Sequence, residues 1–221
     1  MKFALLFTSL FIYSAVSIFT IGNNFRYCVA WVSINMFALS LAYFFNRPDF
    51  ILGKNSHGKI NPLLLILNLH WTLFTWIVFK LQILVSKEQF CHQVKGTNIW
   101  ISRRPGSHDK IDKFDLIIDL TCEFPADKTT SQYICYPNLD GHHLSNLPII
   151  DQIPLDKKIL IHCANGHGRS ALFTALILKA GRTSATLTAA SALITDSRTL
   201  AKPNKSQLKW LMKLEKTCCK F

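Results

Sequence analysis

Three long stretches without a charged residue constrain the fold of this chain more than any other feature of its sequence. They are residues 3–25, 27–46 and 60–79, and each is about as long as a helix must be to cross a bilayer. A cleaved signal peptide is the alternative interpretation of the first stretch, because Lys2 precedes it. The length of that stretch, the lack of a clean cleavage site and the two later stretches favour a retained helix. We therefore expect about three transmembrane helices.

The balance of charge changes near residue 87. Residues 1–87 contain one acidic residue and seven Lys or Arg residues, whereas residues 88–221 contain 12 acidic residues and 18 Lys or Arg residues. This contrast predicts a transmembrane region over residues 1–87 and a soluble domain over residues 88–221. The net charge of +12 suits an anionic membrane surface or a phosphorylated substrate. We expect no nucleic-acid partner, because the basic residues form no block and do not alternate with aromatic residues.

The soluble domain combines short apolar strands with longer helical patterns. Strands are expected at residues 98–102, 114–121, 133–137 and 158–163. Helices are expected at residues 170–181, 183–197 and 204–216. Thr183 and Ser184 are candidate caps for the second helix, and Gly181 ends the first. Strands mixed with helices predict an α/β fold, preceded by the all-α transmembrane region.

One junction in this domain carries the chemistry. In "KKILIHCANGHGRSALFTALIL", residues 157–178, an apolar strand ends at Cys163 and a helix begins near Arg169. A strand–loop–helix junction directs several backbone N–H groups and the positive helix end at one place, which makes an anion site. Gly166 and Gly168 allow the turn and a close approach of the anion.

The side chains of this junction suit phosphoryl transfer. The guanidinium of Arg169 matches two phosphate oxygens, and the field of the loop favours the thiolate of Cys163, which is the nucleophilic form. Ser170 can donate a hydrogen bond to the sulfur and ease its departure. His162 is better placed to orient the loop than to attack.

The segment "HCANGHGRS" resembles the Cys-x5-Arg signature loop of the protein tyrosine phosphatase superfamily, in its dual-specificity branch. The resemblance extends over about residues 97–216, with "FDLIIDLTCEFP" and "SRTLAKPNKSQLKWL" as further matching segments. It implies a sheet flanked by helices and a phosphocysteine mechanism that uses no metal and no other cofactor. The phosphate-binding residues that it implies are Ala164, Asn165, Gly166, His167, Gly168 and Arg169.

The same resemblance implies an upstream aspartate that protonates the leaving oxygen and then activates water. Asp140, in "YPNLDGHH", fits best because it lies 23 residues before Cys163 in a loop after a strand. Asp119 falls inside an expected strand and is better suited to a structural role. Asp151 and Asp156 are rivals in the connection that leads into the cysteine strand.

The sequence leaves the substrate open. Phosphotyrosine, phosphoserine or phosphothreonine of proteins is the leading expectation, because the variable loop positions Ala164, Asn165 and His167 include no Lys or Arg. A phospholipid phosphatase of the phosphatidylglycerophosphate or phosphoinositide type is the alternative, because the apolar region would hold the site near lipid. A phosphate-binding pseudophosphatase is disfavoured, since Cys163, Arg169 and a candidate acid are all present.

The cysteines indicate a reducing compartment. They are seven in number and irregularly spaced, and they have no paired metal-finger spacing. A thiolate enzyme is expected to face the cytosol, so we expect a multi-pass membrane protein with a cytoplasmic catalytic domain. Three crossings would then place the N-terminus outside. The resemblance also implies a possible reversible disulfide between Cys122 and Cys163. The sequence does not indicate the oligomeric state.

Overall fold

The computed structural model describes residues 2–145, 153–181 and 183–218. The chain divides into two compact units. The first unit contains Met1–Asn55, Lys59–Val85 and Cys122–Pro125. The second unit contains Ser56–Gly58, Ser86–Thr121 and Ala126–Phe221.

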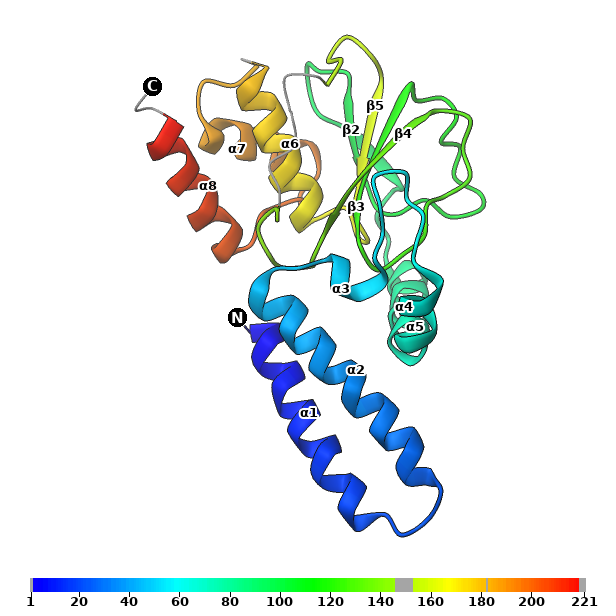
Figure 1. The fold of residues 1–221 in the computed structure, drawn as a ribbon. Helices are drawn as coiled ribbons and strands as arrows, with labels where there is room; N and C mark the ends of the chain where they lie inside the picture. The colour runs from blue at the N-terminus through cyan, green and yellow to red at the C-terminus, as the bar shows by residue number, and fades with distance from the viewer. Residues whose placement is uncertain (1, 146–152, 182, 219–221) are drawn as a thin grey trace. The chain divides into compact units, whose positions relative to one another are not determined.

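The first unit is helical throughout its regular structure. Its elements are α1 (Lys2–Thr20), α2 (Phe25–Phe45), α3 (Asp49–Leu52), α4 (Pro62–Leu67) and α5 (Leu69–Val85). Figure 1 shows α1 and α2 side by side, joined by a short turn as a helical hairpin. These two helices are long and apolar enough to cross a membrane.

The hairpin exposes its apolar side chains. In α1 the buried residues are Ala4, Phe7 and Ser14, whereas Tyr13 is 75% exposed and Phe19 is 90% exposed. A core helix of a water-soluble protein would bury such residues. The outer surface of the hairpin is therefore suited to an apolar surrounding.

The expected third membrane span over residues 60–79 is wrong as a single helix. Asn61 begins a short helix, α4, by accepting a hydrogen bond from Leu63 N (2.9 Å), and α4 ends at Asn68. The side-chain amide of Asn68 donates to the carbonyls of Leu64 and Ile51, both at 2.8 Å, which interrupts the helix. The following helix, α5, has 17 residues and spans about 26 Å, less than the roughly 30 Å of a bilayer core.

The second unit is built on a five-stranded sheet with the order β1-β2-β5-β3-β4. The strands are β1 (Cys91–Gln93), β2 (Ile99–Ser102), β3 (Leu116–Thr121), β4 (Gln132–Asn138) and β5 (Ile159–His162). β1 pairs antiparallel with β2, and the other pairs are parallel. The central strand β5 therefore lies between β2 and β3, with its carboxyl end at the same edge as theirs.

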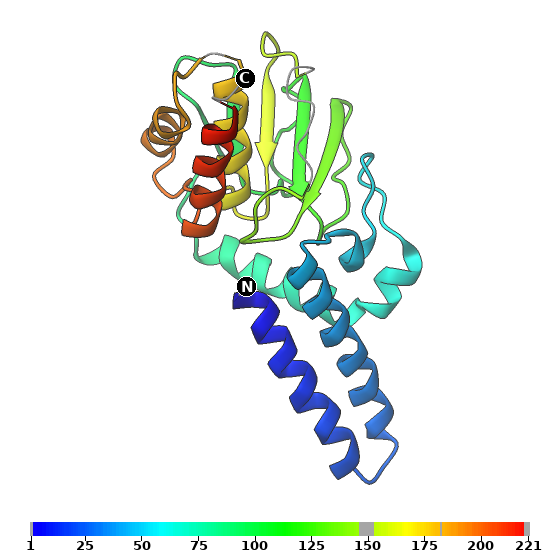
Figure 2. The ribbon, with the colours of Figure 1, turned by 60° about the vertical axis from the view of Figure 1, so that its left-hand side comes forward.

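Three helices accompany this sheet: α6 (Gly168–Ala180), α7 (Leu187–Ser197) and α8 (Lys205–Cys218). Figures 1 and 2 show all three on one side of the sheet. Alternate residues of the buried strands divide between two clusters, as the period of a β-strand requires. Ile159 and Ile161 of β5 pack in the cluster that contains α6, and Leu160 packs in a second cluster with Phe114.

The expected α/β fold is observed, with two local differences. β1 was not expected from the sequence. The α7 helix begins at Leu187 rather than near Thr183 or Ser184, because Thr186 is the residue whose hydroxyl accepts a hydrogen bond from Ala189 N (3.0 Å). Gly181 follows the last residue of α6, as the sequence predicted.

Candidate active site

The loop between β5 and α6 lies directly against the end of β2. Cys163 follows β5 and is 3% exposed. Gly166 has a φ of +72°, and a Cβ at this position would lie 2.5 Å from the carbonyl carbon of Ser102 and 2.6 Å from the amide nitrogen of Arg103. No other residue fits this approach, because the atoms in the way belong to the backbone.

Two carbonyls of the loop accept hydrogen bonds from residues outside the loop. Ala164 O accepts a hydrogen bond from Arg104 N (2.8 Å), and Asn165 O accepts one from Arg198 Nη2 (3.3 Å). A trans peptide directs its C=O and N–H to opposite sides. The amides that follow these two carbonyls, those of Asn165 and Gly166, are therefore turned toward the inside of the loop, where an anion would bind.

Arg169 connects the loop to the ends of the neighbouring strands. Its side chain is 1% exposed, and Nη1 donates to Asn138 O at 2.9 Å and to Leu120 O at 3.4 Å. Its Nε lies 3.3 Å from Oδ1 of Asp140, whose side chain is 63% exposed. The structure thus brings Arg169 and the candidate acid together at the carboxyl edge of the sheet, with Asp140 open to solvent.

The beginning of α8 holds the loop that carries Asp140. Asn204 Nδ2 donates to Gly141 O (2.9 Å), and Gln207 Nε2 donates to His142 O (2.8 Å). Asn204 and Gln207 also cap the helix reciprocally, since each side chain accepts a hydrogen bond from the other's backbone N–H at 2.9 Å. Burial lowers the pKa of His142 to about 4, so this ring is neutral near pH 7.

His162 directly precedes Cys163 and Ser170 directly follows Arg169, and both side chains are fully buried. Among the residues that the structure describes, the hydroxyl of Ser170 has no hydrogen-bond partner. His162 Nδ1 lies 3.9 Å from Oδ1 of Asp119. Asp119 accepts hydrogen bonds from Thr121 N (2.7 Å) and Tyr133 OH (2.6 Å), as a structural carboxylate does.

The rival acids lie elsewhere. Asp156 precedes β5, so it is at the opposite end of that strand from Cys163, and its backbone carbonyl accepts a hydrogen bond from Asn98 (3.1 Å). Asp151 lies outside the described residues. Neither Cys122 nor Cys163 forms a disulfide among the described residues, and a reversible disulfide between them stays a prediction.

Arg198 and Glu88 contact the loop but were not expected from the sequence. Arg198 Nη2 donates to Glu88 Oε2 (3.2 Å) as well as to the loop carbonyl of Asn165, and Glu88 Oε2 lies 2.7 Å from Nε2 of His167. Burial lowers the pKa of Arg198, and the charges of Glu88 and Cys163 oppose that shift. No local pattern indicated either residue, because their partners lie about 30 to 110 positions away in sequence.

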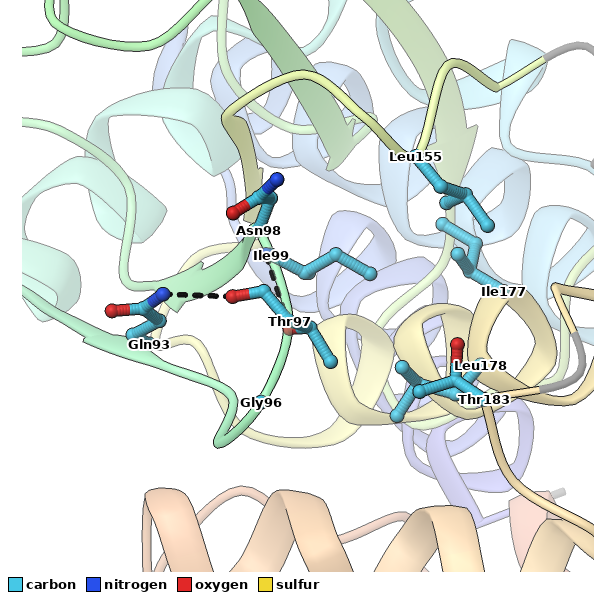
Figure 3. Close-up of a pocket in the computed structure, with 9 residues that line it drawn as sticks. All are labelled: Gln93, Gly96, Thr97, Asn98, Ile99, Leu155, Ile177, Leu178 and Thr183. Carbon is cyan, nitrogen blue, oxygen red and sulfur yellow. Dashed lines mark hydrogen bonds between the residues drawn. The ribbon is translucent and has the colours of Figure 1, made fainter.

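A separate pocket of about 410 Å³ lies at the other end of β2. Figure 3 shows it between Asn98 and Ile99 at the start of that strand and Ile177 and Leu178 near the end of α6. Its described lining includes no ionisable side chain, so it offers neither a nucleophile nor a proton donor. In the described part of the chain, no group of three His, Cys, Asp or Glu residues is arranged to hold a metal ion.

Comparisons with known proteins find similarity only among solved structures. No protein-family model matches the chain, and no curated protein matches it. The structure of Tk-PTP in a mutant form is 22% identical with a TM-score of 0.48, covering 59% of this chain and 97% of that one. Human DUSP28 is 16% identical with a TM-score of 0.48, covering 59% and 96%. PTPMT1 in complex with PI(5)P is 18% identical with a TM-score of 0.49, covering 58% and 96%.

Proposed function

We propose that this chain is a membrane-anchored, cysteine-dependent phosphatase that hydrolyses phosphomonoesters of proteins through a phosphocysteine intermediate. The observation that carries the proposal is the arrangement at the carboxyl edge of the sheet. A buried cysteine begins a loop with inward-facing amides, and Arg169 at the end of that loop lies 3.3 Å from an exposed carboxylate. A nucleophile, an anion site and a proton donor are what phosphoryl transfer needs.

The first step transfers the phosphoryl group to the enzyme. The Cys163 thiolate attacks phosphorus while the bond to the ester oxygen breaks, and protonated Asp140 gives its proton to that oxygen. The loop amides and Arg169 hold the equatorial phosphate oxygens. The leaving alcohol or phenol carries away the proton and departs neutral.

The second step releases phosphate. Water attacks phosphorus, the carboxylate of Asp140 accepts its proton, and the P–S bond breaks. The hydroxyl of Ser170, which has no partner in the described part of the chain, donates a hydrogen bond to the departing thiolate. Neither step consumes a cofactor, and the products are inorganic phosphate and the dephosphorylated residue.

The proposed anchor is the hairpin of α1 and α2. Its exposed apolar side chains and the length of both helices support two crossings rather than three. With two crossings, the start of α1 and the end of α2 lie on the same side of the membrane. We place that side, and the catalytic unit, in the cytosol, because a thiolate nucleophile needs a reducing compartment.

A phospholipid phosphatase is the second candidate. The observation that favours it is the group of exposed apolar residues Leu200, Leu208 and Met212, which belong to α8 and the segment before it. Because α8 also holds the Asp140 loop, an apolar surface here would suit a lipid substrate. Phosphopeptides and phospholipids presented to the same preparation would separate the two candidates.

The test is a metal-free assay of the full chain in lipid nanodiscs with p-nitrophenyl phosphate, with and without vanadate. Cys163→Ser should abolish turnover, and Asp140→Asn should lower kcat about 100-fold. Matched controls are Cys91→Ser, a partly exposed thiol on β1, and Asp156→Asn at the far end of β5. Turnover that survives Cys163→Ser, or a folded wild-type chain with no activity and no affinity for vanadate, would exclude the proposed mechanism.

A further inference from the structure

The outward face of α8 is strongly basic. Lys205, Lys209, Lys213 and Lys216 are all exposed and recur at intervals of three and four residues, so they line one side of the helix. The acidic residue of this helix, Glu215, is turned away from them, because its Oε1 accepts a hydrogen bond from the backbone N–H of Leu187 (3.0 Å). The four exposed lysines therefore give this face of α8 a positive charge.

Apolar side chains lie among these lysines. Outside residues 3–85, the exposed large apolar residues of the described chain are Leu200, Leu208 and Met212. Met212 is 59% exposed, whereas Leu211 beside it is buried in the core of the unit. The second unit thus exposes large apolar side chains in one short part of its sequence.

A shallow pocket of about 520 Å³ lies on the same helix. It is lined by Trp210, Met212, three of the lysines and His143, whose ring stacks on Trp210 with centroids 5.5 Å apart. Apolar side chains surrounded by flexible lysines suit a ligand that has an apolar interior and an anionic surface.

We propose that this face of α8 docks onto an anionic phospholipid surface. The inference rests on the proposed function in one respect, because it takes the chain to be held at a membrane. Lysines near such a surface are attracted by its negative potential, and the apolar side chains between them enter the headgroup region. The face contains no arginine, whose guanidinium can donate two hydrogen bonds to one nucleic-acid phosphate. The lack of arginine favours a lipid over a nucleic acid as the partner.

Docking would act on the loop that carries Asp140, through contacts that α8 already makes with it. Asn204, just before α8, and Gln207 in its first turn hold the backbone of Gly141 and His142, and Trp210 stacks on His143. Gly141, His142 and His143 directly follow Asp140. Fixing α8 at a surface would therefore fix the loop that carries the proposed acid, and kcat should rise while KM for a small soluble ester stays nearly constant.

The binding test uses amide hydrogen exchange of the full chain in nanodiscs of phosphatidylcholine, alone or mixed with phosphatidylglycerol. We expect exchange in residues 205–216 to slow on the order of tenfold in the anionic discs, and added salt should reverse the effect. Combined Lys209→Gln, Lys213→Gln and Lys216→Gln substitutions should remove the protection. The control substitutions Lys110→Gln, Lys128→Gln and Lys157→Gln affect exposed lysines elsewhere in the same unit and should leave it intact.

Equal exchange in the two kinds of disc would overturn the proposal. Protection of α8 by a short RNA or an acidic peptide in neutral discs, stronger than the protection by anionic lipid, would overturn it as well. The exchange measurement needs no turnover, so Cys163→Ser should show the same lipid-dependent protection. Protection without any phosphatase activity would refute the proposed function alone, and activity without protection would refute the docking surface alone.

A separate measurement tests whether docking of α8 affects the loop that carries Asp140. Hydrolysis of p-nitrophenyl phosphate should show a kcat about threefold higher in anionic than in neutral discs, and the triple Gln variant should lose this difference. Lipid-dependent protection of α8 with an unchanged kcat would refute the link to the loop.

Discussion

The two units of the chain distribute polar and apolar side chains in opposite ways. In the first unit, large apolar residues such as Phe19 and Leu84 are exposed, while polar residues such as Asn35 and Asn68 are completely buried. In the second unit, all six residues of β3 are buried and five of them are apolar or Thr. The contrast supports the proposed membrane anchor, because a lipid surrounding suits the exposed apolar side chains of the first unit, whereas water suits the second unit, which buries its sheet.

Buried polar groups therefore have different roles in the two units. In the first, the Asn35 amide donates to Asn68 and links α2 to the break between α4 and α5. In the second, buried polar residues gather at the carboxyl edge of the sheet, as Ser102, Arg169 and Arg198 do. Such residues join helices of the first unit to one another, whereas in the second unit they surround the candidate active site.

The largest expected effect concerns which side of the membrane the hairpin turn occupies. Gly22 lies in that turn with open space around it, so Gly22→Cys should fold normally. With two crossings and a cytosolic catalytic unit, a membrane-impermeant thiol reagent should label this cysteine on intact cells. With three crossings it should be protected until the membrane is opened. A cysteine in place of the exposed Ser107 of the second unit should be labelled only after opening.

The next effect concerns the close approach inside the second unit. Gly166→Ala should lower kcat by about 100-fold or more, because its Cβ would lie 2.5 Å from backbone atoms of Ser102 and displace the loop. Gly96→Ala is a matched control, since Gly96 has a similar φ of +71° but nothing within 4 Å of its Cβ position. Similar losses in both variants would show that backbone strain, not the contact with β2, is responsible.

Much of this second unit could be predicted from its sequence. The strands β2 to β5 and the helix α6 follow from local patterns, and the Cys163–Arg169 loop follows from a short motif, because each depends on residues close together in the chain. The resemblance implied Asp140 as the candidate acid, and in the structure its Oδ1 lies 3.3 Å from Nε of Arg169, while its role as the acid stays a prediction.

What escaped prediction depends on contacts distant in sequence. Arg198 reaches the loop carbonyl of Asn165 and the carboxylate of Glu88, 110 positions away, and no local pattern encodes such a meeting. In the first unit, residues 60–79 have the composition of a membrane helix, but Asn68 turns its amide to Ile51 O and interrupts it. A hydropathy average over about 20 residues hides this one polar side chain, although the helix breaks at it.

A moderate effect is expected where the chain enters the second unit. Glu88→Gln should lower kcat for p-nitrophenyl phosphate about tenfold and weaken vanadate binding similarly, because Arg198 and His167 lose their shared anionic partner. Asp196→Asn removes an exposed ion pair with Lys95 and should change neither quantity. A purely structural role of Glu88 would lower the melting temperature while leaving vanadate affinity per folded molecule unchanged.

A smaller effect is expected for the buried amides of the first unit. Asn68→Leu should destabilise the folded chain by about 1–2 kcal/mol in a detergent unfolding titration, because it leaves the Asn35 amide without its partner. The double variant with Asn35→Leu should be less destabilised than the sum of the two single variants. Additive losses would contradict a direct coupling of the two amides.

The smallest effect is a dependence of stability on pH that belongs to the second unit. Burial lowers the pKa of His142 to about 4 in the folded chain, whereas an unfolded histidine titrates near 6.5. Between these values the unfolded state binds more protons, so stability rises with pH across this window and is nearly constant on either side. Because the ring is partly exposed to solvent, we expect the contribution to stay below about 1 kcal/mol. The melting temperature of the full chain should therefore be slightly lower at about pH 5 than at pH 7, and His142→Asn should reduce that difference, whereas substitution of the exposed His108 should not. A difference that is unchanged by His142→Asn would assign the slope to other groups, and it would contradict a neutral His142 ring in the loop that carries Asp140.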